Sequence, residues 1–424
     1  MSQSNIHTEP RVAAADSTAR TSRTAMTVLL SVSAAHLLND AMQSAVPAVF
    51  PVFQQEMHLS FFQIGWIAFT LNITASILQP LIGLYTDRRP LPALLPLGMV
   101  FSLLGMVGLA LAPSFAVLLL SAALIGIGSS VLHPESSRVA HLAASKRSTE
   151  GKKRGGKGFA QSVFQVGGNM GQALAPLMVA FIINPGGRYG FLWFTLLAAA
   201  GIAIQYKVSK WYREHQRAKD AVNKSAARAG GGTPFSKSFI AITLAILILM
   251  LFSKFAYLSS MGGYYAFYYM DTYHLPLERA QLAIFALQFA GMIGTFFGGP
   301  LADRFGRQKI IWFSILGTAP FSMLLPYAGP VGSILLCIAI GLVLMSGFSV
   351  IIVYAQELLP GHVGTIAGLF FGLSFGLGGL SSVLLGWLMD SHGVDYMVKI
   401  CAYLPLLGLF ALLLPKDSKI MART

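Results

Sequence analysis

Two residues that can exchange a proton lie close together in an apolar stretch of the sequence. His36 and Asp40 are four residues apart, and Asn39 and Gln43 flank Asp40. Residues at this spacing share one face of a helix, so the imidazole and the carboxylate can meet. Charged groups among apolar residues are costly unless they are paired or hydrated. The group is therefore a candidate for binding a substrate or a proton.

A second group of titratable residues follows another apolar stretch. His133 changes charge near neutral pH and is suited to a proton relay. Glu135 and Arg138 are three residues apart and can form an ion pair on one helix face. Pro134 is expected to kink the helix and turn these groups inward. The competing interpretation is a hydrated helix end with a local ion pair, and the sequence leaves both open.

Amide side chains form a stripe along a third apolar stretch. Gln161, Gln165, Asn169 and Gln172 follow one another at spacings of 4, 4 and 3. The stripe lies on one helix face and would be unfavourable against lipid, so it is expected to face protein or water. Neutral amides can bind a polar substrate or hydrogen-bond to a neighbouring helix, and both interpretations stay open.

Membrane-spanning helices are needed to position these residues. The chain has 424 residues, 55% apolar or aromatic and 11% charged, with a mean hydropathy of +0.65. An ordinary soluble domain is about 25% charged, which excludes a water-soluble enzyme. A helix of about 20 apolar residues crosses the ~30 Å hydrocarbon core. Twelve such windows predict an all-α membrane protein with twelve transmembrane helices. They are 26–53, 62–85, 91–112, 114–137, 159–183, 190–208, 238–265, 278–301, 309–328, 331–357, 362–388 and 396–415.

The formal net charge of +14 is explained by topology. If the N-terminus is cytoplasmic, 26 of the 30 basic residues fall in cytoplasmic loops and tails. Only Arg188, Arg279 and Lys399 lie on the other side. This bias predicts that both termini are cytoplasmic, and it removes the reason to expect a nucleic-acid partner.

A basic loop at residues 151–157 has the spacing of a phosphate-binding loop up to its lysine. The next residue is Gly158, so the hydroxyl that holds magnesium in such loops is missing. We therefore expect a flexible basic loop and no nucleotide motor. Any transport would draw on an ion gradient, with no cofactor and no metal site.

The chain divides into two similar halves. Gly83, Asp87 and Arg88 follow the second window, and a matching motif follows the eighth, 216 residues later. The second motif comprises Gly299, Asp303, Arg304, Gly306 and Arg307. In both motifs the glycine would let a helix approach closely, the aspartate would cap the next helix, and the arginine would bind a carboxylate. The predicted units are a tail (1–25), a six-helix bundle (26–206), a linker (207–237), a second bundle (238–415) and a tail (416–424).

This repeat resembles the major facilitator superfamily of secondary transporters. The resemblance covers about residues 26–415 and implies two pseudo-symmetric six-helix bundles, a central cavity and alternating access. The first motif departs from the family pattern, since Arg88-Arg89-Pro90 lacks the later glycine.

Four segments resemble a narrower branch of this family, the fosmidomycin efflux pumps of bacterial inner membranes. They are 35–40, 129–140, 161–169 and 354–361. The resemblance implies export of fosmidomycin, a small phosphonate antibiotic, with proton antiport as the usual coupling. The fourth span lacks the mid-helix arginine that many drug–proton antiporters carry.

Lys254 lies within the seventh span, at nearly the same place in the repeat as Asp40. Asp40 precedes Asp87 by 47 residues, and Lys254 precedes Asp303 by 49. Lys254 can bind a phosphonate while Asp40 and His36 take a proton. Tyr257 lies on the same side of the span as Lys254 and can contact a ligand. The competing interpretation is a permanent salt bridge between spans one and seven.

We therefore expect a secondary active efflux transporter that exports a small anionic drug in exchange for protons. The alternative is a proton-coupled uptake symporter for an organic phosphate. A membrane-embedded enzyme is disfavoured, because His133 with Glu135 is its one faint catalytic candidate. Glu357, at the end of span ten, is expected to act as a cytoplasmic gate or cap. The expected partners are the substrate, protons and membrane lipid, and the chain is expected to be a monomer.

Overall fold

A computed structural model of the chain describes residues 9–148, 156–220, 235–358 and 363–415. Within these ranges the regular elements are all helical. The α-helices are α1 (Glu9–Ala48), α2 (Phe50–Met57), α3 (Phe61–Arg88), α4 (Leu94–Leu111), α5 (Phe115–Ser148), α6 (Gly156–Met178), α7 (Asn184–Gly186), α8 (Phe194–Asp220), α9 (Lys237–Ser259), α10 (Tyr265–Tyr273), α11 (Leu277–Phe305), α12 (Arg307–Leu316), α13 (Ala319–Leu324), α14 (Pro330–Met345), α15 (Phe348–Leu358), α16 (Val363–His392) and α17 (Val394–Cys401). Short π- or 3₁₀-helical segments continue some of them: Val179–Ile183, Gly187–Trp193, Ser260–Tyr264, Leu325–Tyr327 and Leu404–Leu413.

Eleven helical stretches of the described chain are long and apolar enough to cross a membrane. One of them, Val163–His215, has 53 residues. At 1.5 Å per residue it would extend for about 80 Å, far more than one ~30 Å hydrocarbon core. The stretch is broken at Gly187, where φ is +57°, and so provides two crossings. The twelve predicted spans are thus all helical. The first helix ends at Ala48, five residues before the predicted boundary.

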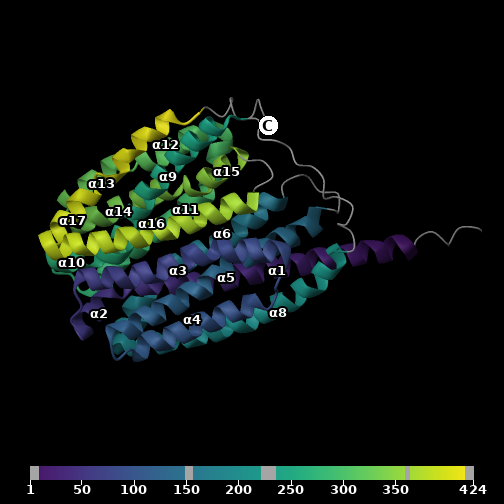
Figure 1. Ribbon diagram of the computed structural model, residues 1–424, viewed down its shortest axis with the longest axis horizontal. Helices are drawn as coiled ribbons and strands as arrows, with labels where there is room; N and C mark the ends of the chain where they lie inside the picture. The colour runs from purple at the N-terminus through teal and green to yellow at the C-terminus, as the bar shows by residue number, and fades with distance from the viewer. Residues whose placement is uncertain (1–8, 149–155, 221–234, 359–362, 416–424) are drawn as a thin grey trace, which may run out of the picture.

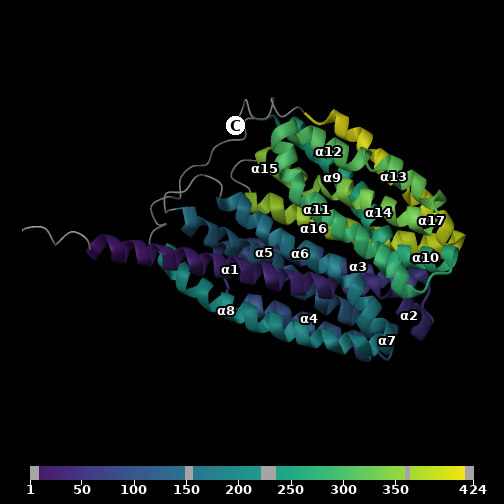
Figure 2. The same cartoon turned by 180° about the vertical axis from the view of Figure 1, so that it is seen from behind.

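The helices form two groups that lie side by side (Figures 1 and 2). The first group contains α1, α3, α4, α5, α6 and α8, and the second contains α9, α11, α12, α14, α15 and α16. Two helix pairs join the groups, α3 with α16 and α6 with α11. Small residues let α3 and α16 approach closely: a β-carbon at Gly65 would collide with the carbonyl oxygen of Ser382. This is the two-bundle architecture that the sequence predicted.

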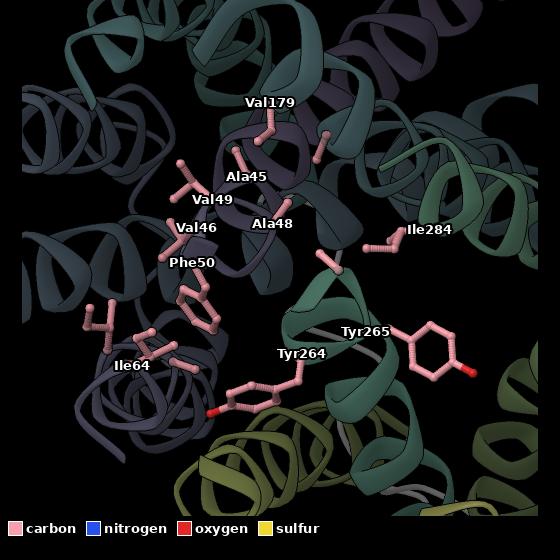
Figure 3. Close-up of a cluster of buried hydrophobic side chains, with 14 of the residues drawn as sticks. Ala45, Val46, Ala48, Val49, Phe50, Ile64, Val179, Tyr264, Tyr265 and Ile284 are labelled. Atoms are coloured by element: carbon pink, nitrogen blue, oxygen red, sulfur yellow. The ribbon is translucent and has the colours of Figure 1, made fainter. Parts of the chain in front are cut away.

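One end of the bundle is sealed by apolar side chains from both groups. We call the end where α1 begins the inner end and the opposite end, at Ala48, the outer end. At the outer end Phe50 lies near Tyr264, with ring centroids 6.0 Å apart (Figure 3). Phe61 and Phe267 meet edge to face at 5.0 Å. These contacts close the outer end between the groups.

Polar contacts reinforce the outer seal. The carboxylate of Asp390, at the end of α16, accepts hydrogen bonds from the first two backbone N–H groups of α3, those of Phe61 (3.0 Å) and Phe62 (2.8 Å). Gln281 of α11 donates to the carbonyl of Ala48 at 2.7 Å. Among the described residues, side-chain hydrogen bonds between the two groups occur at this end. Opening the outer end would therefore break specific bonds as well as apolar contacts.

The repeated glycine motif packs differently from the sequence-based expectation. Gly83 and Gly299 were predicted to let another helix approach closely, but a β-carbon on either meets none of the described atoms within 4 Å. Gly298 has that role instead, because its α-carbon faces the carbonyl of Ser346. Gly306 has a φ of +94°, a left-handed value that favours glycine at the break between α11 and α12.

Candidate functional site

Three titratable side chains from two helices meet in the interior of the first group. In α1, His36 Nε2 lies 3.3 Å from Oδ2 of Asp40. His133 of α5 places its Nε2 3.4 Å from the other carboxylate oxygen. The two imidazole rings meet edge to face, with centroids 5.0 Å apart. All three side chains are at least nine-tenths buried. We call His36, Asp40 and His133 the acid–imidazole cluster.

Helix α6 packs against this cluster and positions the His36 ring. The ring of Phe164 stacks on His36 with centroids 4.2 Å apart. One turn further along α6, Gly168 lies directly against the cluster: a β-carbon there would overlap the His36 ring and approach Oδ2 of Asp40 to 2.9 Å. Only glycine leaves enough room for the imidazole at this position. Close packing of α1 on α6 thus fixes the orientation of His36.

Neutral polar groups complete the surroundings of Asp40. Gln172 of α6 donates to Oδ2 at 3.0 Å, and Asn39 donates to Oδ1 at 3.1 Å. Ser129 donates to Gln43 at 2.7 Å and lies 3.2 Å from Nδ1 of His133. Asp40 is therefore held by side chains of α1, α5 and α6. A buried carboxylate with this many polar partners is stabilised without a lysine or arginine counter-ion.

The remaining ring nitrogens of the cluster are held by backbone carbonyls. Nδ1 of His36 lies 2.9 Å from the carbonyl oxygen of Phe164. Nδ1 of His133 lies 2.9 Å from the carbonyl oxygen of Ser129, one turn earlier in α5. Each carbonyl can only accept a hydrogen bond, so both Nδ1 atoms carry the hydrogen. Both Nε2 atoms consequently face Asp40.

The second predicted group is divided by the structure. His133 joins Asp40, whereas Glu135 and Arg138 form the predicted ion pair at 3.0 Å. Glu135 is fully buried, and Arg138 also donates to the carbonyl of Thr86 at 2.7 Å. Arg138 thereby ties α5 to the end of α3, within the first glycine motif. Helix α5 runs through Pro134 without interruption.

Lys254 lies in the second group of helices, in α9. Its side chain is fully buried, and Nζ donates to the carbonyl of Leu344 at 2.9 Å. Nζ also lies 5.2 Å from the centroid of the Phe348 ring. No carboxylate of the described residues lies within ion-pair distance of it. The predicted alternative, a salt bridge between Asp40 and Lys254, is therefore absent from this structure.

The break between α14 and α15 accounts for the position of Lys254. Helix α14 ends at Met345, so the carbonyl of Leu344 has no partner in a following helical turn. A positive charge at the carboxyl end of a helix also interacts favourably with the helix dipole. Lys254 thus supplies a donor to the open carbonyl at this interruption of the span.

The amide stripe faces protein, as the sequence predicted for its described members. Asn169 is buried, and Gln165 donates to it at 3.4 Å. The Nδ2 group of Asn169 has no hydrogen-bond partner among the described residues. Tyr257 is also buried, and its hydroxyl likewise lacks a partner in that part of the chain. These two groups can accept a ligand's polar atoms if the interior opens.

Some predicted site residues lie where the structure describes no side chain. They are Gln161, Asp87, Arg88, Asp303 and Glu357. Of the neighbouring motif residues, Arg304 is exposed, and its guanidinium lies 5.3 Å from the ring of Phe305. The gating roles expected for these residues stay predictions.

Sequence reasoning missed Gly168, Ser129 and Asp390. Gly168 follows Gly167 in a segment rich in small residues, and nothing in its spacing indicates that it faces His36. Ser129 precedes His133 by four residues, which places both on one helix face and was a usable signal. Asp390 ends an apolar span and could have been read as a cap for another helix.

The acid–imidazole cluster also has the residue types of a metal site, which the sequence did not predict. One ligand atom from each of His36, Asp40 and His133 can be chosen so that all three lie within 4.8 Å of one another. The ligands come from α1 and α5, 93 residues apart, so no local spacing could reveal them.

Twelve membrane crossings in two groups, with a polar network buried inside one group, define a multi-pass transporter. The chain belongs to the major facilitator superfamily, whose family model matches residues 32–383. It is accordingly a transport protein of small molecules and not an enzyme.

Two relatives match nearly the whole chain. It is 46% identical over 409 residues to the fosmidomycin resistance protein of Escherichia coli (strain K12), covering 96% of this chain and 97% of the relative. It is also 46% identical over 393 residues to an uncharacterised MFS-type transporter, YfnC, of Bacillus subtilis (strain 168), covering 93% and 94%.

Solved structures of two other transporters share the fold. The xylose transporter XylE from E. coli, in a partially occluded inward-open conformation, matches with a TM-score of 0.70 and 14% identity over 93% of this chain and 98% of that chain. The nucleoside transporter NupG matches with a TM-score of 0.67 and 13% identity over 91% and 98%. At this level of identity the likeness concerns the fold alone.

Proposed function

We propose that this protein exports a small anionic drug of the fosmidomycin type across the bacterial inner membrane in exchange for protons. The single observation that carries the proposal is the buried cluster of His36, Asp40 and His133 in a chain 46% identical to a fosmidomycin resistance protein. A buried charge within a membrane protein is costly and is kept where it serves transport.

The proton in this scheme is carried by Asp40 together with His36. Asp40 lies eight residues from the outer end of α1, about 12 Å along the helix. His133 links the carboxylate to α5, which continues past Glu135 and Arg138 toward the inner end. The network thus extends from the middle of the bundle toward the predicted cytoplasmic side.

The drug in this scheme meets the amides first and Lys254 later. Gln43, Gln165 and Asn169 offer neutral hydrogen-bonding groups beside the cluster, and the ammonium of Lys254 supplies the charge for a phosphonate. Lys254 is fully buried in the state described here. The proposal therefore requires that it become accessible in another state of the transport cycle.

Alternating access provides the order of events. The outer end is sealed by Phe50, Tyr264 and the bonds of Asp390. We propose that the drug enters from the inner side, that the seal opens and the drug leaves, and that a proton then binds at the cluster. Both termini and the 207–237 linker are placed in the cytoplasm in this account, and the chain acts as a monomer surrounded by lipid.

Drug accumulation in cells tests the function directly. Cells that produce this protein should accumulate less fosmidomycin than cells without it, and an uncoupler that removes the proton gradient should abolish the difference. In the same assay Asp40→Asn tests the cluster. Its matched control is Asp271→Asn, which lies at an exposed position outside the cluster. Higher accumulation in producing cells would indicate uptake instead of export. Equal accumulation with and without the protein would refute the substrate assignment.

A further inference from the structure

We propose that His36, Asp40 and His133 form a binding site for one transition-metal dication of the Zn²⁺ class. The inference goes beyond the proposed drug export and does not depend on it. Two imidazoles and one carboxylate are a donor set that Zn²⁺ and Co²⁺ prefer, and catalytic zinc sites often combine three protein ligands with an open fourth position.

The distances between the donor atoms fit such an ion. A tetrahedral metal with ligand bonds of about 2.0–2.1 Å separates its ligand atoms by roughly 3.3–3.4 Å. Each histidine Nε2 lies at such a distance from one oxygen of Asp40, that of His36 at 3.3 Å from Oδ2 and that of His133 at 3.4 Å from Oδ1. The chosen ligand atoms of all three residues lie within 4.8 Å of one another. An ion would hold the three donors together by drawing the two rings toward the carboxylate.

The hydrogen bonds of the histidines point the correct nitrogens at the ion. Nδ1 of each ring donates to a backbone carbonyl, of Phe164 for His36 and of Ser129 for His133. A neutral imidazole fixed in this way presents a bare lone pair on Nε2. Metal-binding histidines almost always make this second bond to a carbonyl or carboxylate, which fixes the tautomer.

A positive ion is also what the cluster lacks. Nε2 of His36 is buried and has no hydrogen-bond partner among the described residues, although it lies beside Asp40. With both rings neutral, each Nε2 lone pair faces a carboxylate oxygen of Asp40, which is electrostatically unfavourable. One dication satisfies all three at once. The ion-pair partners of Asp40 within the described chain are the two imidazoles, so no lysine or arginine there competes with the metal.

The neighbouring amides support the carboxylate. Gln172 donates to Oδ2 of Asp40 at 3.0 Å and Asn39 donates to Oδ1 at 3.1 Å, so both act as its supporting partners. Because the donor set alone selects the ion, a metal should bind to the purified protein without any drug present.

Metal binding by the purified full-length chain tests the inference. The probes are Zn²⁺, followed by calorimetry, and Co²⁺, followed by its visible absorption, on tag-free protein stripped of metal. We expect one ion per chain and a four-coordinate Co²⁺ spectrum. His133→Gln and Asp40→Asn should each weaken binding by about 100-fold. The control His392→Gln removes an exposed histidine and should leave binding unchanged.

X-ray absorption of the Zn²⁺-loaded wild-type protein keeps the test independent of the variants. Scattering from two imidazoles at about 2.0–2.1 Å is expected. A spectrum with oxygen ligands alone, no saturable binding, or equal loss of binding in His392→Gln would overturn the proposal. Failure of drug export with intact metal binding would refute the proposed function instead.

Discussion

Asp40 and Lys254 occupy nearly equivalent places in the two halves of the sequence, but their surroundings differ. Asp40 is in contact with side chains from α1, α5 and α6, two of which are imidazoles. Lys254 has a carbonyl at a helix end and an aromatic face. The first half therefore contains a connected polar network, and the second half contains an isolated charge. The two halves of a duplicated fold can thus place a buried charge in very different surroundings.

The largest effect is expected from removal of the charge in the first half. Asp40→Asn keeps the shape of the side chain but removes its negative charge, so proton-driven export should fall by about 100-fold, as for loss of a positioned proton carrier. The rate of fosmidomycin uptake into inverted vesicles under an imposed pH gradient measures this, because export from the cell becomes uptake in that orientation. Export at the wild-type rate would show that the cluster does not couple transport.

The second prediction concerns the space that Gly168 of α6 leaves for the His36 ring. Gly168→Ala places a methyl group against the His36 ring, and such overpacking costs about 1–3 kcal/mol. We expect both thermal stability and export to fall. Gly186→Ala is the matched control, because a β-carbon there meets no described atom within 4 Å. Equal melting temperatures for the two variants would contradict the packing described for His36.

The third prediction concerns Lys254, the buried charge in the second half, and distinguishes its effect on drug binding from its effect on stability. Lys254→Met removes a buried ammonium that has no acidic partner among the described residues, so stability should stay the same or rise. Drug binding should weaken by about tenfold, the loss of roughly 1.4 kcal/mol from one charged hydrogen bond. Binding is measured on purified protein, with Lys399→Met, at an exposed position, as the control. Unchanged affinity would remove Lys254 from the drug site.

The smallest effect is expected at the outer seal. Asp390→Ala removes the two hydrogen bonds that the first turn of α3 makes to α16, together worth about 1 kcal/mol, and should shift the population toward an outward-open state by about fivefold. Labelling of Ala48→Cys by an impermeant maleimide, in a Cys337→Ala and Cys401→Ala background, reports that shift. Asp395→Ala is the control, since Asp395 pairs within its own helix with Lys399. Slower labelling in Asp390→Ala than in the control would contradict the seal.

Hydropathy and helical spacing predicted much of this molecule because both are local properties. The twelve spans follow from runs of apolar residues, and the His36–Asp40 and Glu135–Arg138 pairs follow from residues one turn apart. The direction of the amide stripe could also be predicted, because lipid does not accommodate it.

Contacts between distant helices could not be predicted in this way. His133 meets Asp40 because α5 packs on α1, and no spacing along the chain indicates which helices are neighbours. The same limit explains why Gly83 and Gly299 were assigned close contacts that Gly298 makes instead. Whether a buried charge has a partner depends on these contacts, so the separation of Asp40 from Lys254 became visible only in three dimensions.

Transport by the purified protein in liposomes, with pH gradient and voltage set separately, tests the central claim most directly. The account predicts that a pH gradient alone drives fosmidomycin movement against a counterflow of protons, and that Asp40→Asn abolishes the gradient-driven part. Drug movement that is the same with and without a pH gradient, or the same in protein-free liposomes, would contradict it.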